Sequence, residues 1–463
     1  MRFLFVTLEP READFYRRVS QWLGGRGHEA VHLTWSPYAA RRLRRAGFDA
    51  RAVPAELKSA LEGRELDAEA ERLEATYAMA HLRDVYRTDW PCHGRSEDWS
   101  VERTVRHFLA VERVLDEVRP DVVVPEVGSE TVRTAAHLVA LQRGIDVLFP
   151  FYTIFPQPLR LYANTMHAPI VAQDELRDLD AGERAEVEQF IAAFIDRDRP
   201  IRAHRQPRVT SQTLRDFVTQ VAVASTFDRA NDYLRPQRFA KNYLRERTRA
   251  LAARPLYEQL GESPRPFVYF PLHVTDDYKI LRVIPHLVDQ AAVIELIAAS
   301  LPQGVDLVLK EHPLSIGRNR LSFLARLRRH DNVRLVDPYT SSHELIRRAE
   351  AVAVISSTVG LEALLHGKPV LTVGEPFYGG YGVTLDVDSL RELPAAVPRL
   401  LRFTPDRERT LRFLHAAMRA CRPGKTITVD DSDENAVALA GSLAAAATEL
   451  AAKRDRPPAP VGA

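Results

Sequence analysis

Three hydroxyl residues, Ser356, Ser357 and Thr358, stand between a short apolar run and a segment with helical spacing, in the stretch AVAVISSTVGLEALLHGKP. The first turn of a helix has backbone N–H groups without partners, and its dipole favours negative charge, so this junction predicts an anion site. We expect no acidic residue in that turn. Gly360 would let a ligand approach, and Glu362 would accept hydrogen bonds from a ribose. Ordinary helix capping by Ser357 accounts for the same residues, so the motif alone does not distinguish an anion site from a helix cap.

Other strands that we predict in the same part of the chain also end in polar side chains. These are His273 and Asp277 after the strand at 267–270, and Lys310, His312 and Pro313 after the strand at 305–309. In open parallel sheets the ligands bind at the carboxyl ends of the strands, so these groups should converge on one edge. Lys310 and His312 can neutralise phosphate oxygens. Together with the hydroxyl stretch they predict a site for a nucleotide and its phosphate.

A metal site is the alternative for His273, Asp276 and Asp277, but their spacing matches no strong ligand pattern. Cys92 and Cys421 are far apart and form no CxxC motif. We therefore predict no metal, no cofactor and no disulfide framework.

The elements that would position these groups alternate between strand and helix. Arg2–Leu8, 30–35, 121–125 and 146–149 are the predicted strands of a first sheet, and 267–270, 305–309, 333–336, 351–355 and 369–373 those of a second. The alternation predicts an α/β fold with two Rossmann-like, doubly wound parallel-sheet domains. The first strand is not followed by GxGxxG, so no dinucleotide fingerprint is present.

The same pattern gives a predicted domain organisation. It comprises an N-terminal Rossmann-like domain at 1–160, a helical connecting region at 161–260, a C-terminal Rossmann-like nucleotide-binding domain at 261–400, helices at 401–453 and a disordered tail at 454–463. The basic stretch 197–208 in the connecting region is interpreted as a solvated connection between domains, with phosphate binding as the alternative.

The first domain offers two candidate catalytic carboxylates. Glu126 and Glu130 lie in PEVGSE, directly after the valine-rich strand at 121–125. A carboxylate there could take a proton from an acceptor hydroxyl. A surface loop with a helix-capping glutamate explains either residue equally well.

Composition excludes several classes of function. The 463 residues have 64 basic and 62 acidic side chains, a net charge of +2, which gives no support to nucleic-acid binding. No signal peptide is recognisable at MRFLFVTLEP, and no uninterrupted apolar run reaches the roughly 18–20 residues that span a bilayer. We expect a cytoplasmic protein, with peripheral contact at the inner face of the membrane left open.

The stretches FVYFPLHVTDDYKI, VLKEHP and SSTVGLEALLHGKPVLTVGEPFYGGYG resemble, in that order, the bacterial capsule-polysaccharide biosynthesis family, which includes Kdo transferases. The HP and SS pairs are also similar to those of bacterial polysialyltransferases. The resemblance is specific over residues 266–382. It implies a GT-B fold with two domains facing a cleft, binding of CMP by His312, Pro313, Ser356 and Ser357, and a lipid-linked or growing glycan as the acceptor. The acidic pair followed by glycine of the polysialyltransferases is absent, unless PEVGSE stands in its place.

Residues and resemblance together predict a metal-independent glycosyltransferase of surface polysaccharide synthesis. Its partners would be a nucleotide-sugar, with CMP-Kdo favoured over UDP-sugars, and a glycan or glycolipid acceptor. Two alternatives stay open: a glycerol-phosphate-type phosphotransferase, and a non-catalytic export or scaffold protein.

Overall fold

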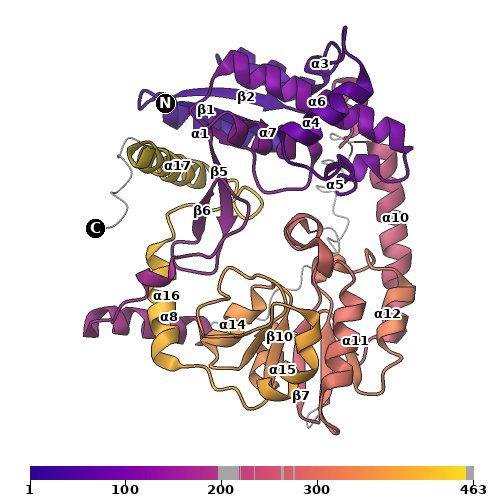
Figure 1. Ribbon diagram of the computed structural model, residues 1–463, viewed down its shortest axis with the longest axis vertical. Coiled ribbons are helices and arrows are strands. Elements are labelled where there is room, and N and C mark those ends of the chain that lie inside the picture. The colour runs from indigo at the N-terminus through magenta and orange to yellow at the C-terminus, as the bar shows by residue number, and fades with distance from the viewer. Residues whose placement is uncertain (197–217, 219–220, 234, 262–264, 275–276, 455–463) are drawn as a thin grey trace. The chain divides into compact units, whose positions relative to one another are not determined.

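The computed structural model describes residues 1–196, 218, 221–233, 235–261, 265–274 and 277–454 (Figure 1). They fall into two compact units. Unit 1 contains the described parts of 1–167, 214–237 and 421–463, and unit 2 those of 168–213 and 238–420.

Unit 1 is built on a six-stranded sheet with the order β3-β2-β1-β4-β5-β6. All neighbours are parallel except β5 and β6, which are antiparallel. The strands are β1 (Arg2–Thr7), β2 (Glu29–Thr34), β3 (Asp49–Ala52), β4 (Val122–Val124), β5 (Asp146–Tyr152) and β6 (Leu159–Ala163). The helices are α1 (Pro10–Gly24), α2 (Pro37–Arg45), α3 (Val53–Glu56), α4 (Leu66–Thr76), α5 (Arg83–Tyr86), α6 (Glu97–Val118), α7 (Thr131–Gln142) and α17 (Asp433–Arg454).

Unit 2 has a second six-stranded sheet, entirely parallel, with the order β12-β11-β10-β7-β8-β9. The strands are β7 (Phe267–Pro271), β8 (Asp306–Lys310), β9 (Val333–Val336), β10 (Ala351–Val354), β11 (Val370–Thr372) and β12 (Leu385–Asp386). The helices are α8 (Ala181–Asp196), α10 (Pro236–Ala253), α11 (Gln290–Ser300), α12 (Leu321–Leu327), α13 (Ser342–Arg348), α14 (Val359–Leu365), α15 (Leu393–Leu400) and α16 (Arg407–Arg419).

Counted from its own first strand, each sheet has the order 3-2-1-4-5-6, which is the order of the Rossmann fold. The apolar runs of β7, β8 and β10 are buried throughout, as expected of parallel strands covered by helices on both faces. The predicted fold class of two Rossmann-like, doubly wound sheets, as in GT-B proteins, is thus confirmed. In each sheet the direction of winding reverses between two neighbouring strands: β1 and β4 in the first, β10 and β7 in the second.

The units differ from the predicted domain organisation in how they use the connecting and C-terminal helices. Helices α8 and α10 belong to unit 2 rather than to a separate connecting region, and the C-terminal helices divide, with α16 in unit 2 and α17 in unit 1. Residues 197–208 and 455–463 lie outside the described part of the chain. The assignment of a helix to a unit depends on which distant apolar surface it packs against, and its local spacing does not contain that information.

One described helix, α17, is long and apolar enough to cross a membrane by length and composition alone. However, its residues Leu439, Ala440 and Leu443 are fully buried in the core of unit 1, where α17 packs with α1. This burial is typical of the core helix of a folded domain.

Candidate functional site

The reversal point of the second sheet brings together two of the predicted strand ends. His273 follows β7 and Ser356 follows β10, and the Ser356 N–H donates to His273 Nε2 at 3.0 Å. Because an amide N–H only donates, Nε2 must be unprotonated, and the neutral ring then carries its proton on Nδ1. Burial, together with the charges of Lys279 and His312, lowers the pKa of His273 to about 3, which keeps the ring neutral. His273 therefore acts here as an oriented, uncharged group.

Lys310 is the last residue of β8 and is buried, with 4% of its surface exposed. Its Nζ donates to Ser342 Oγ at 2.6 Å and to the Thr340 carbonyl at 3.0 Å. Burial lowers the pKa of Lys310 to about 8, opposed by Glu362, and burial raises the pKa of Glu362 to about 7, opposed by Lys310. The two groups therefore influence each other's charge at this sheet edge, and both titrate close to neutral pH.

His312 and Pro313 form the turn after β8, where Pro313 begins a short 3-10 helix (Pro313–Ser315). His312 is exposed, and its Nδ1 accepts a hydrogen bond from the Leu314 N–H at 3.2 Å. In the neutral ring this places the proton on Nε2, which is a donor suited to a phosphate oxygen. The preceding Glu311 is fully buried and accepts from Tyr257 and from Asn319.

The hydroxyl stretch differs in two respects from the expectation. Helix α14 begins at Val359, so Glu362 lies in its first turn, and the expectation that this turn has no acidic residue is wrong. Ser357 Oγ accepts from the Val359 N–H at 3.3 Å, and Thr358, at the N-cap position, makes no side-chain cap. A capping role of Ser357 thus accounts for part of the motif.

Gly360 is explained by packing against Tyr378. A Cβ at this position would collide with the phenol of Tyr378, whose hydroxyl donates to the Ser357 carbonyl. The close approach that glycine permits is therefore used by a tyrosine side chain of the same unit.

Asp277 and Lys279 lie in the turn that follows β7; Thr275 and Asp276 are outside the described residues. Asp277 Oδ1 accepts from the Lys279 N–H at 2.8 Å. Lys279 is buried, its Nζ lies 5.7 Å from the centre of the Phe377 ring, and burial lowers its pKa to about 8. It begins a π-helical turn (Lys279–Val283), a conformation that is frequent at functional sites. Sequence reasoning assigned no role to this lysine, because its burial depends on Phe377, almost a hundred residues away.

The reversal point of the first sheet carries a second group of titratable residues. Glu126 follows β4 and is buried, with 6% exposed, and its backbone is left-handed at φ 60°. Its Oε1 accepts from the hydroxyl of Tyr16, a fully buried residue of α1. Burial raises the pKa of Glu126 to about 7, while the hydrogen bond from Tyr16 lowers it. A non-glycine residue held in this conformation stores strain of the kind that concentrates at functional sites.

Arg133 on α7 connects the other carboxylates of this edge. Its guanidinium is 2.7 Å from Glu12 and 3.3 Å from Glu130. Burial raises the pKa of Glu130 and that of Glu9, which follows β1. Glu9, Glu12 and Arg133 were missed, although a survey of strand ends in the first domain, like that in the second, would have found the first two.

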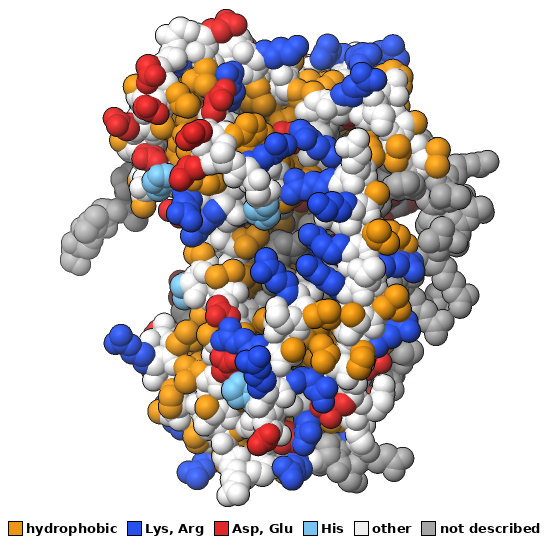
Figure 2. Space-filling view, turned by 90° about the vertical axis from the view of Figure 1, so that its right-hand side faces the viewer, with side chains coloured by type: hydrophobic (Ala, Val, Ile, Leu, Met, Phe, Trp, Pro, Cys, Tyr) orange, Lys and Arg blue, Asp and Glu red, His pale blue; other side chains and the backbone are white. Residues whose placement is uncertain are grey.

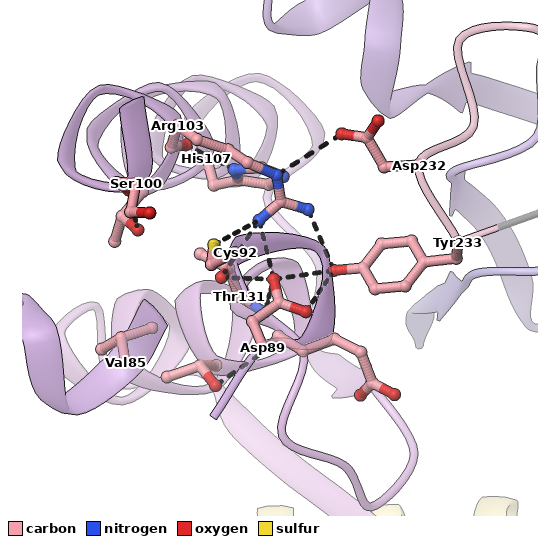
Figure 3. A network of polar contacts seen from close by, with 12 residues as sticks. Val85, Asp89, Cys92, Ser100, Arg103, His107, Thr131, Asp232 and Tyr233 are labelled. Carbon is pink, nitrogen blue, oxygen red and sulfur yellow. Dashed lines mark hydrogen bonds and ion pairs between the residues drawn. The ribbon is translucent and has the colours of Figure 1, made fainter. Parts of the chain in front are cut away.

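A buried polar network fixes the start of α7, which carries Arg133 (Figure 3). Asp89 accepts from the backbone N–H and Oγ1 of Thr131 at 3.1 and 2.6 Å, and from Arg103 at 2.7 Å. The Tyr233 hydroxyl donates to the same carboxylate at 2.9 Å and accepts from Arg103 at 3.2 Å. The Asp89 carboxylate thus ties Thr131, Arg103 and Tyr233 together, and the network supports the Glu130–Arg133 segment.

Neither group of residues forms a metal centre in the described parts of the chain, where no cluster of three or more histidine, cysteine, aspartate or glutamate side chains could hold an ion. Two cavities of about 530 and 240 Å³ in unit 2 are lined by residues from 173–186 and 406–419, and by none of the residues above. The chemistry of the sheet edges, rather than cavity size, therefore locates the candidate site.

The fold and the side chains at the two sheet edges define a class of protein. It is an α/β protein with two Rossmann-like units, each with titratable side chains at the reversal point of its sheet. Residues 186–399, a little under half of the chain, match the family model described as capsule polysaccharide biosynthesis protein, which confirms the resemblance noted from the sequence.

Individual relatives match over shorter stretches. The chain is 32% identical to Protein FixF of Sinorhizobium fredii over 150 residues, which cover 32% of this chain and 36% of FixF. It is 33% identical to the capsule polysaccharide modification protein LipA of Neisseria meningitidis serogroup A over 104 residues, 22% of this chain and 15% of LipA. Among solved structures, the KpsC β-Kdo 2,7 transferase of Thermosulfurimonas dismutans aligns with 65% of this chain and 88% of that chain, at 17% identity and a TM-score of 0.30. The matched stretches span well under two thirds of both sequence relatives, and the structural likeness is too low to inform the site.

Proposed function

We propose that this protein is a glycosyltransferase of surface polysaccharide synthesis that transfers a sugar from a nucleotide donor to a glycan or lipid-linked acceptor. The observation that carries the proposal is the hydrogen bond between Ser356 and His273, 83 residues apart, at the reversal point of the second sheet. Ligands of open α/β sheets bind at such points, and two lysines, Lys279 and Lys310, are buried at the strand ends around this one.

Unit 2 would bind the nucleotide. Lys310 and His312 would face the phosphate, and Lys279 is a further cation at the same edge. Charge neutralisation by such groups stabilises a leaving phosphate without a metal ion. Glu362, whose pKa is raised to about 7, would accept hydrogen bonds from the ribose in either protonation state, because a carboxylic acid retains one carbonyl oxygen. CMP-sugars with a Kdo-like sugar remain the favoured donors, on the family resemblance.

Unit 1 would supply the base. In the transfer step the acceptor hydroxyl attacks the anomeric carbon, the bond from that carbon to the phosphate oxygen breaks, and the hydroxyl proton passes to a carboxylate. Glu126 suits this role because a general base works best when its pKa lies near the working pH. Glu130 is the alternative, and its pairing with Arg133 makes it the weaker base. Neither metal nor cofactor takes part, and the location is the cytoplasm, at the inner face of the membrane where the acceptor is lipid-linked.

Calorimetric titration with CMP, CDP, UDP and GDP tests the donor site on the wild type and on His312→Ala. The control is His286→Ala, an exposed histidine of the same unit that the site does not use. We expect CMP to bind most tightly and His312→Ala alone to weaken it about tenfold, the loss of one charge-assisted hydrogen bond. Tighter binding of UDP than of CMP would indicate that the donor is a UDP-sugar. No binding of any nucleotide would refute the transferase and favour the scaffold alternative, and phosphodiester products would select the phosphotransferase.

A further inference from the structure

Helix α10 presents an unusual outer face. Leu244 and Leu251, seven residues and therefore two helical turns apart, are 66% and 57% exposed. Lys241 and Thr248, three residues before and four after Leu244, are exposed on the same side. A single exposed leucine on a surface needs no explanation, but two of them aligned on one helix do.

The rest of the helix is strongly basic. Between Pro236 and Ala253 it has five arginines and lysines and one acidic residue, a net charge of +4, twice the net charge of the whole chain. Lys241 and Arg245, and Arg254 just beyond the helix, are exposed, and among the described residues no ion pair holds any of the three. Figure 2 views the side on which α10 lies in Figure 1, and Lys and Arg side chains gather there beside hydrophobic ones.

The opposite face fixes the helix to unit 2. The backbone of Glu246 packs so closely against Gly317 that a Cβ at Gly317 would collide with it. The Arg249 side chain donates to the Arg318 carbonyl at 3.4 Å, and Ala253 is buried in the core under the second sheet. The outer face is therefore presented on a rigid support.

We propose that this face of α10, formed by Lys241, Leu244, Arg245 and Leu251 together with the adjoining Arg254, docks the protein on an anionic phospholipid surface. The leucines would insert among the acyl chains at the boundary with the headgroups, and the cations would pair with lipid phosphates. A rigid helix with a few projecting apolar residues among arginines and lysines has the character of an interfacial membrane helix. The proposal does not depend on the proposed enzymatic function, because it concerns a different surface and needs no donor.

Two features favour a bilayer over a macromolecular partner. Nucleic acid would use the cations and leave the leucines exposed, since its affinity comes from phosphate contacts. A protein partner commonly anchors on aromatic side chains buried in a pocket, whereas the most exposed apolar residues of α10 are Leu244 and Leu251, ahead of Tyr243 at 41%. A bilayer accommodates both kinds of side chain at once, because long basic side chains reach the headgroups while apolar ones enter the chains.

Vesicle sedimentation of the full chain tests the proposal. Vesicles of equal parts phosphatidylglycerol and phosphatidylcholine are compared with vesicles of phosphatidylcholine alone, at low and high salt. The variants are Leu244→Ser/Leu251→Ser and Lys241→Gln/Arg245→Gln/Arg254→Gln. The control is Val288→Ser, which changes an apolar residue elsewhere on unit 2 that is 50% exposed. Circular dichroism melting checks that each variant is folded. Surface substitutions on a supported helix should leave the fold intact.

We expect binding to the anionic vesicles that weakens with salt. Each leucine that inserts should contribute roughly tenfold to the partition coefficient, so the double variant should lose about a hundredfold. Each removed charge should cost roughly fivefold on anionic vesicles, and Val288→Ser should bind as the wild type does. The proposal is overturned if the wild type ignores anionic vesicles, or if the serine variant binds as well as the wild type. Binding that is lost only with the cations, and is matched by RNA, would also overturn it in favour of a simple polyanion site.

Discussion

Replacing Glu126 by glutamine tests whether the buried carboxyl of unit 1 has the perturbed pKa that a base near neutral pH needs. Glutamine has nearly the same shape and retains the oxygen that accepts from Tyr16. It does not ionise, so the variant removes the cost of charging a buried group without opening a cavity. We expect Glu126→Gln to be increasingly more stable than the wild type as the pH rises.

The sign and size of this stability difference follow from the linkage between proton binding and folding. Burial raises the pKa of Glu126 in the folded protein from 4.5 to about 7, so between these values the folded state binds more protons and wild-type stability falls as the pH rises. A difference of this size corresponds to about 3 kcal/mol in full, most of which arises between about pH 5 and pH 8. For a unit of this size, that is a relative shift in melting temperature of roughly 5–10 °C.

Thermal unfolding followed by circular dichroism at several pH values measures the difference between variant and wild type. Glu117→Gln is the control, because Arg51 lowers the pKa of this exposed carboxyl. The stabilisation that Glu117 provides is complete above its unfolded pKa and is lost only at lower pH, so its variant should differ from the wild type by a constant amount across the same window. A Glu126 difference that is equally constant would show that this carboxyl ionises in its ordinary range, and the argument for it as the base would fail.

Three further predictions concern the sheet edges. Tyr16→Phe removes the hydrogen bond that lowers the pKa of Glu126, so the acid limb of the pH–rate profile should move up by about 1–2 units, and an unmoved limb would exclude Tyr16 as the group that positions the base. Because the pKa of Lys310 is about 8, wild-type affinity for CMP should fall as the pH rises through that value, whereas Lys310→Met should bind CMP weakly at every pH. Calorimetry below and above pH 8 measures this difference, and a wild-type affinity that does not change with pH would contradict the role of Lys310. His273→Ala leaves the Ser356 N–H without its acceptor, so the free energy of unfolding in denaturant titration should fall by about 1–2 kcal/mol. CMP binding measured by calorimetry should also weaken, and unchanged CMP binding would remove His273 from the site.

The sequence predicted the two sheets because their central strands are nearly pure apolar runs separated by helical spacing. It missed β3, β6 and β12, and each omission has a physical reason. Half of the β3 sequence DARA is charged and the other half is alanine, because an edge strand needs little apolar surface, and β12 has only two residues. β6 returns antiparallel after the short segment that follows β5, a reversal that the regular alternation of strand and helix does not indicate.

The convergence of His273, Lys310 and Ser356 was predictable for a related reason: the carboxyl ends of neighbouring parallel strands lie at one edge whatever the loops contain. The burial and the charge of each side chain were not predictable from the sequence. PEVGSE has the composition of a surface loop, and only the fold places Glu126 beneath Tyr16, 110 residues away, where burial and not its neighbours in sequence decides its pKa. The same holds for Gly360, whose missing side chain would serve an approaching ligand and an approaching Tyr378 equally well. Spacing along the chain thus determines which chemical groups reach a sheet edge, whereas contacts between distant residues determine which of them are charged and which are already engaged. A substitution that alters only such a distant contact, as Tyr16→Phe does, is therefore the more discriminating test of the site than removal of a predicted residue.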